Sequence, residues 1–191
     1  MKKIILFMLI ACFAMASLAL ADEPVSKPVD KPKYNTNTVY FEKVTAKPGD
    51  HFAVKAYIFN VDTLAGCQVP IFYRSDKINL LCDSISVVGS RCDYFMFQDI
   101  KIPQSDKEDK VAYFSYIVTI DPDTYVNPLP PGDGLIATIY FTAPKDCPEG
   151  VVKLTRGMIP HPYISFIFAV WSPAGEEVDG TFEESEIIIK K

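Results

Sequence analysis

The chain has 191 residues and carries 24 acidic against 19 basic side chains, which gives a formal net charge of −5 at pH 7. This acidic excess, without a cluster of lysine and arginine, argues against nucleic acid or an anionic membrane surface as a partner. The length suits one folded domain with a substantial hydrophobic core.

Residues 1–21 have the pattern of a secretory signal peptide. Two lysines precede an apolar run over residues 4–16, and Ala19-Leu20-Ala21 supplies the small residues of a cleavage site. The apolar run is too short for a membrane span. We therefore expect an exported bacterial protein that is secreted, periplasmic or held at the cell surface. Lipid attachment at Cys12 is the alternative, because Leu9-Ile10-Ala11 resembles the segment before a lipidated cysteine.

Residues 22–37 are expected to form an extended linker. Prolines at positions 24, 28 and 32 alternate with charged residues, and apolar side chains are few. Such a composition cannot build a hydrophobic core. The folded domain is therefore predicted over residues 38–191.

The predicted domain alternates apolar and polar residues with the period of β-strands. The segment His51–Asn60 places Phe52, Val54, Ala56 and Ile58 on one face. The segment 67–73 divides in the same way. One face holds Cys67, Val69, Ile71 and Tyr73, and the other holds Gln68, Pro70 and Phe72. Because proline has no N–H, we expect Pro70 to lie where its strand faces an edge, a bulge or solvent.

Further strands are predicted along the rest of the domain. They cover residues 38–45, 85–88, 94–100, 111–120, 135–142, 151–156, 164–171 and 182–189. These segments are rich in β-branched and aromatic residues, and Pro, Gly, Asp and Asn separate them. No ten-residue segment has a clear helical period. Many short strands in a chain of this length indicate an all-β sandwich or barrel.

Four cysteines remain once the signal peptide is removed: Cys67, Cys82, Cys92 and Cys147. An even number in an exported protein favours disulfides, and three pairings exist. We predict the local pair Cys82–Cys92. The alternative for Cys67, which has apolar neighbours, is a buried free thiol. The spacings fit no zinc site.

Enzymatic motifs are lacking in the sequence. It has neither a Gly-x-Ser-x-Gly turn nor a glycine-rich phosphate loop, and His51 and His161 have no partner at metal-ligand spacing. A glycosidase pair among the C-terminal glutamates is an alternative. We expect these glutamates to lie instead at a solvated hairpin tip and on an exposed terminal edge strand. They are Glu176, Glu177, Glu183, Glu184 and Glu186. The sequence therefore predicts a protein that is not an enzyme.

Two acidic turns, at residues 121–123 and 131–134, contain Asp121, Asp123 and Asp133. Calcium sites need six or more oxygen ligands, and each turn alone offers too few carboxylates. We therefore expect turn geometry rather than metal binding, and no cofactor. A structural calcium ion shared by the two turns is the alternative.

Several of these segments together resemble the cohesin family. The likeness covers residues 40–189 and is carried by Gly49-Asp50, Leu64–Gln68, the corner Tyr73–Leu80, Gly134–Phe141, Pro148-Glu149-Gly150 and Gly180-Thr181-Phe182. Cohesins are non-catalytic, nine-strand jelly-roll β-sandwiches related to some carbohydrate-binding modules. They bind dockerin modules through one sheet face and assemble polysaccharide-degrading complexes. The resemblance therefore implies the same fold and a dockerin-like protein partner.

The resemblance also indicates a binding face. Gly66 and Gln68 stand where cohesins often have Asn and Asp that bind dockerin, and Arg74-Ser75 replaces the Asp-Pro of the family corner. An exposed apolar patch typically marks a partner site. We predict a partner-binding face made of Gln68, Pro70, Phe72, Tyr116 and Tyr140. The alternative is direct polysaccharide binding, in which Tyr116, Tyr140 and Trp171 stack on sugar rings.

Overall fold

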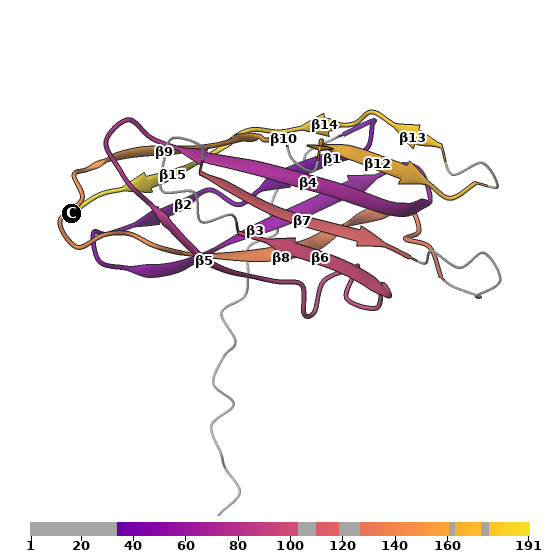
Figure 1. The fold of residues 1–191 in the computed structure, drawn as a ribbon, viewed down its shortest axis with the longest axis horizontal. Coiled ribbons are helices and arrows are strands. Elements are labelled where there is room, and N and C mark those ends of the chain that lie inside the picture. Colours follow the sequence, from indigo (N-terminus) through magenta and orange to yellow (C-terminus); the bar gives the residue numbers. More distant parts are fainter. Residues whose placement is uncertain (1–33, 103–109, 119–126, 161–162, 173–175) are drawn as a thin grey trace, which may run out of the picture. The chain divides into compact units, whose positions relative to one another are not determined.

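The computed structural model describes residues 34–102, 110–118, 127–160, 163–172 and 176–191. These residues form fifteen β-strands and no helix, so they include none that could cross a lipid bilayer. The strands make two large sheets and one two-stranded sheet (Figure 1). The predicted all-β sandwich is confirmed.

The smaller of the two large sheets, the five-stranded sheet, has the order β14-β1-β3-β8-β5. Its strands are β14 (Thr181–Phe182), β1 (Thr38–Phe41), β3 (His51–Asn60), β8 (Gly132–Thr142) and β5 (Leu81–Ser86). Neighbouring strands are antiparallel except for β1 and β14, which run parallel.

The eight-stranded sheet contains the path β13-β12-β4-β9-β15-β2, with β7 paired to β4 and β6 paired to β7. Its strands are β13 (Glu177–Val178), β12 (Ile167–Val170), β4 (Leu64–Arg74), β9 (Gly150–Arg156), β15 (Ser185–Ile189), β2 (Val44–Ala46), β7 (Val111–Ile117) and β6 (Phe97–Lys101). Figure 1 shows β4, β7 and β6 side by side, with β12 and β9 beside opposite ends of β4. The two-stranded sheet pairs β10 (Ile159–Pro160) with β11 (Tyr163–Ile164).

The inner faces of the two large sheets share one hydrophobic core. Val54 and Ile58 of β3 belong to the same buried cluster as Val69 and Ile71 of β4. The predicted inward face of β4 is confirmed, because Cys67, Val69, Ile71 and Tyr73 are all buried. Alternation of apolar residues along β4 was therefore a correct guide to its orientation.

The corner Tyr73–Leu80, which the cohesin resemblance indicated, connects the two large sheets. β4 ends at Arg74 in the eight-stranded sheet, and β5 begins at Leu81 in the five-stranded sheet. Tyr73, Ile78 and Leu80 are buried in the common core on both sides of this connection. The break in the apolar pattern thus marks the place where the chain crosses between sheets.

Pro70 lies inside β4, next to an interruption in the neighbouring strands. β12 pairs with β4 as far as Gln68, and pairing with β9 begins at Ile71. Between them, the amide of Gly157 donates to the Pro70 carbonyl over 2.9 Å. The missing N–H of Pro70 faces the same side as this carbonyl, so the β4–β7 ladder loses no bond.

The C-terminal strand differs from the prediction. β15 is not an edge strand, because it lies between β9 and β2. The glutamates at 176, 177, 183, 184 and 186 are nevertheless all exposed, as expected. The wrong assignment arose because β2, which covers the far side of β15, is far away in the sequence and pairs in parallel.

Candidate functional site

A row of small and apolar residues crosses the outer face of the eight-stranded sheet. The strand register places Phe97 of β6 opposite Ile117, Ile117 opposite Gly66, and Gly66 opposite Ala169 of β12. Phe97 and Ile117 are each 39% exposed. We call Phe97, Ile117, Gly66 and Ala169 the apolar row.

Gly66 leaves the middle of this row without a side chain. A Cβ at this position would stand only 2.4 Å from the carbonyl oxygen of Tyr116, so β4 and β7 approach too closely for any side chain. The row therefore has no side chain between Ile117 and Ala169.

Trp171, which is 47% exposed, follows β12, and its amide donates to the Thr63 carbonyl beside the start of β4.

Along the same face, the second row is mainly polar, and the side chains of the third row are buried. Asp99, Ser115, Gln68 and Ile167 lie opposite one another in the second row. In the third row, Pro70 and its neighbour Tyr113 are both buried. In the fourth row Phe72 is half-buried, and the Arg74 guanidinium lies 3.7 Å above the centre of its ring. The open part of the face is therefore the end that carries the apolar row.

The predicted binding face is only partly assembled in the structure. Gln68, Pro70 and Phe72 do share the outer face of β4, as predicted, although Pro70 is buried. Tyr116 does not belong to this face. It lies opposite Cys67, is 0% exposed, and donates its hydroxyl proton to the Ile136 carbonyl inside the core. Burial raises its pKa, which keeps this hydroxyl protonated.

Tyr140 is also wrongly placed in the predicted face, because it belongs to the other sheet. It lies in β8 of the five-stranded sheet, opposite Ala53 and Ser84. Its ring stacks on the His51 ring with centroids 6.0 Å apart. His51 in turn lies 3.2 Å from a carboxylate oxygen of Asp83. His161 falls outside the described residues.

The residues that the sequence prediction missed are Phe97, Ile117 and Ala169. Each lies in a segment that was expected to be a strand, but their common row depends on the register between β6, β7, β4 and β12. A possible sequence signal was Gly66, since a glycine inside a strand often marks a close approach of two backbones.

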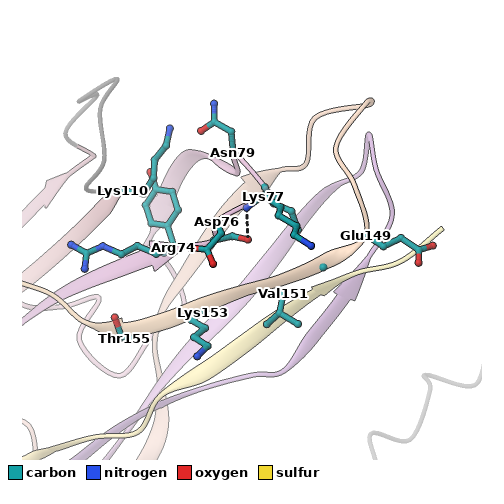
Figure 2. Close-up of a pocket in the computed structure, with 13 residues that line it drawn as sticks. Arg74, Asp76, Lys77, Asn79, Lys110, Glu149, Val151, Lys153 and Thr155 are labelled. Carbon is teal, nitrogen blue, oxygen red and sulfur yellow. Dashed lines mark hydrogen bonds between the residues drawn. The ribbon is translucent and has the colours of Figure 1, made fainter.

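A groove lies at the opposite end of this face, at the corner where β4 leaves the sheet. It has a volume of about 890 Å³ and is lined by residues 73–79, Lys110, Glu149–Val151, Lys153 and Thr155. Figure 2 shows Arg74, Asp76 and Lys110 on one side of this corner groove and Lys153 and Thr155 on β9 at the other. Four of its side chains are basic and two are acidic.

The cysteine pair predicted from the sequence is not present. All four described cysteines are free thiols. Cys82 lies in β5 opposite Phe141, whereas Cys92 lies in the segment between β5 and β6. Burial raises the pKa of the Cys82 thiol and of the Cys92 thiol to about 12 in each case, and raises that of Cys67 as well. These thiols are therefore protonated and unreactive at neutral pH.

The described residues form no cluster of three or more metal-ligating side chains. Asp133 accepts a hydrogen bond of 2.7 Å from the Tyr40 hydroxyl. The other acidic turn, with Asp121 and Asp123, falls outside the described residues. The five C-terminal glutamates do not line the corner groove.

No family model and no curated protein sequence matches the chain. Its structure does match solved cohesins. A cohesin from Clostridium thermocellum, solved in a type I cohesin–dockerin complex, gives a TM-score of 0.61 at 19% identity, over 82% of this chain and 94% of that one. The seventh ScaB type I cohesin from Pseudobacteroides cellulosolvens gives 0.56 at 16% identity, over 81% and 92%.

A non-cellulosomal cohesin from the hyperthermophilic archaeon Archaeoglobus fulgidus gives a TM-score of 0.53 at 14% identity, over 82% of this chain and 92% of that one. These matches cover nearly the whole length of each cohesin. At such low identities they establish the fold, and they confirm the resemblance seen in the sequence. The described part of the chain has a cohesin-like fold.

Proposed function

We propose that this protein is a non-catalytic recognition module that binds a dockerin-type protein module through the outer face of its eight-stranded sheet. The observation that carries the proposal is the apolar row, whose Phe97 and Ile117 side chains are exposed on a sheet of cohesin-like fold. The similar C. thermocellum cohesin was solved in a complex with a dockerin. The matched fold makes the same kind of partner the natural first candidate.

The chemistry of the apolar row suits a protein partner. Phe97 and Ile117 expose apolar surface to water, and burying that surface against a partner is favourable at about 25 cal/mol per Å². Aromatic and aliphatic anchors near the centre of an interface carry most of its binding energy. Gly66, which is buried against β7, adds no side chain of its own between Ile117 and Ala169.

We further propose that the module acts outside the cell in a system that handles polysaccharides. This part of the proposal is supported by the signal-peptide pattern of residues 1–21 and by the resemblance to cohesins. Direct binding of a polysaccharide has less support, because Tyr116 is buried and Tyr140 stacks on His51 in the other sheet. Of the three proposed stacking residues, Trp171 alone is an exposed residue (47%), and it lies directly after β12, the strand next to β4.

The test is calorimetric titration of the purified chain with a panel of purified dockerin modules in calcium-containing buffer. We expect at least one dockerin to bind. We expect Ile117→Asp to weaken that binding roughly 30-fold, which corresponds to the loss of about 2 kcal/mol at a central interface residue.

The matched control is Leu81→Asp, which introduces the same charge at a leucine that is 46% exposed on the five-stranded sheet. This variant should bind as tightly as the wild type. Absence of binding across the whole panel, or equal losses for the two variants, would contradict the proposed function.

A further inference from the structure

Strand β6 (Phe97–Lys101) forms an edge of the eight-stranded sheet. It pairs with β7, and among the described residues no second strand pairs with it. All five of its residues are exposed, whereas most residues of β4 and β7 in the same sheet are buried. Figure 1 shows β6 at the margin of this sheet, beyond β7. An edge of this kind presents backbone N–H and C=O groups with which another strand can pair.

The two faces of β6 each carry one exposed apolar side chain. Phe97 lies on the outer face, opposite Ile117, and Ile100 lies on the inner face, opposite the fully buried Phe114. Ile100 is nevertheless 38% exposed. The core of the sandwich therefore ends at β6 with an apolar side chain that is only partly covered. A second strand alongside β6 would remove more of this side chain from water, which is favourable.

The outer face of β6 also carries one acid and one base. Asp99 and Lys101 are two residues apart, so their side chains lie on the same face of the strand. Lys101 Nζ lies 2.7 Å from a carboxylate oxygen of Asp99, and both side chains are about half exposed. An ion pair with this exposure adds little to stability, so exchanging its partners costs little. A strand with this pattern is self-complementary when a second copy lies antiparallel to it.

A two-fold axis through Ile100 makes use of both features. In this register Asp99 of each copy lies opposite Lys101 of the other copy, which gives two cross-strand ion pairs on the outer face. On the inner face, the two Ile100 side chains lie opposite each other, and Gln98 lies opposite Ile102. Pairs of opposite charge and pairs of apolar side chains both stabilise antiparallel strands. A second copy therefore supplies the complementary pattern by itself.

Other two-fold registers that keep both outer faces on one side of the joined sheet fit less well. An axis through Asp99 or through Lys101 places two like charges directly opposite each other, which destabilises a sheet. An axis through Gln98 places Asp99 opposite Phe97 and forms no ion pair. The charge pattern of β6 thus favours the axis through Ile100.

We propose that β6 is a self-association edge, at which a second copy of this chain adds its own β6 antiparallel to the first about a two-fold axis through Ile100. The two eight-stranded sheets then form one continuous sheet, with both apolar rows on the same outer face. Such an isologous contact is the commonest kind in homodimers. The ladder has about five residues from each copy, against roughly 20–30 in a standard interface, so the dimer forms at high protein concentration.

The first experiment exchanges the charges of β6 and measures molecular mass by sedimentation equilibrium, from about 10 μM to about 1 mM protein. The wild-type mass should rise with concentration toward that of a dimer. Asp99→Lys and Lys101→Asp should each stay monomeric, because each substitution places like charges opposite one another. An equal mixture of the two variants should dimerise again, because each variant supplies the charges that the other requires.

The matched controls are Lys55→Asp and Glu186→Lys, which reverse exposed charges on β3 and β15. Each should dimerise like the wild type, alone and in the mixture. A wild-type chain that stays monomeric at every concentration would overturn the inference. Dimers that persist in both Asp99→Lys and Lys101→Asp would overturn it too, because the contact would then lie elsewhere.

The second experiment tests the register with single cysteines. Because the two Ile100 side chains face each other in the dimer, Ile100→Cys should form an intermolecular disulfide when oxidised glutathione takes up the electrons of the two thiols. Gln98→Cys should not form one, because the two positions are four residues, or about 14 Å, apart along the paired strands. The four native thiols are the same in both variants, so a difference between the variants comes from β6.

The outcomes separate this inference from the proposed function, because no dockerin takes part in either experiment. If Gln98→Cys cross-links as readily as Ile100→Cys, the axis does not pass through Ile100 and the inference is overturned. If Ile117→Asp abolishes dockerin binding but the chain never dimerises, the self-association is wrong and the proposed function stands. If the chain dimerises through β6 and no dockerin binds it, the proposed function fails and the self-association remains.

Discussion

The outer faces of the two large sheets both carry apolar and aromatic side chains, but they use them differently. On the five-stranded sheet, the Tyr40 ring lies 5.2 Å from the Tyr57 ring and 5.3 Å from the Tyr34 ring. The hydroxyls of Tyr40 and Tyr34 donate to Asp133 and Glu183. On the eight-stranded sheet, no ring among the described residues packs on Phe97, and Ile117 beside it is exposed.

This difference separates stability from recognition. Aromatic rings that contact one another, with their hydroxyls bonded within the chain, already have partners and stabilise the fold. Exposed apolar side chains grouped in one row gain free energy only when another molecule covers them. Exposed hydrophobic content by itself would not distinguish the two faces, whereas the contacts of each side chain do.

The largest effect on stability is expected for Gly66→Ala in the apolar row. The new Cβ would stand 2.4 Å from the Tyr116 carbonyl oxygen, so β4 and β7 must move apart. Urea unfolding should show a loss of about 1–3 kcal/mol. In the control Gly150→Ala, the nearest atom is the flexible end of Ile78 at 3.2 Å, and the loss should be smaller. Equal losses would show that the close approach at Gly66 is not a constraint.

Phe97→Ala should reduce partner binding without affecting the fold. We expect about tenfold weaker dockerin binding, or about 1.4 kcal/mol, with the free energy of unfolding unchanged within about 0.5 kcal/mol. Tyr163→Ala, at an exposed aromatic residue outside the apolar row, should change neither quantity. A loss of stability as large as the loss of binding would erase the distinction between the two faces.

Tyr40→Phe should have the opposite signature. It removes the hydrogen bond to Asp133 and is expected to lower the free energy of unfolding by about 1 kcal/mol while dockerin binding stays the same. Tyr140→Phe is the control, since no hydrogen bond of the Tyr140 hydroxyl is found among the described residues. Weaker dockerin binding by Tyr40→Phe would move the binding surface to the five-stranded sheet.

The smallest expected effect concerns the buried thiols. Burial raises the pKa of Cys82 and Cys92 from 9.0 to about 12, so the folded state keeps both protonated while the unfolded chain ionises near pH 9. Their contribution to stability is therefore complete below pH 9 and is lost as the pH rises toward 12. Urea unfolding at pH 7.5 and 10 should show this decline in the free energy of unfolding, and Cys82→Ala should make the decline shallower.

Titration of the denatured protein with a thiol reagent should find all four thiols of the folded domain free.

Much of the fold could be predicted from local patterns. Alternation in segment 67–73 identified Cys67, Val69, Ile71 and Tyr73 as the side chains of β4 that enter the core. The corner Tyr73–Leu80, taken from the resemblance to cohesins, is the connection between the sheets. Both features are determined within a few residues, because a strand that is buried on one face must alternate, and a chain that changes sheet must break that alternation.

The binding face could be predicted only in part, because it depends on long-range register. In β7 the first six residues are all buried, so alternation could not show that Tyr116 points inward. Which sheet contains Tyr140 is decided by the pairing of β8 with β3 and β5, whose paired residues lie more than fifty positions earlier in the chain. The apolar row likewise combines residues from four separate strands.

The most direct test of the central claim is to map the bound dockerin on the labelled chain by amide chemical shifts. We predict that the largest changes occur in β6, β7, β4 and β12, around Phe97, Ile117, Gly66 and Ala169. Amides on the five-stranded sheet, such as those of Lys55 and Thr138, should not change. Changes concentrated on β1, β3 and β8 instead would contradict the assignment of recognition to the eight-stranded sheet.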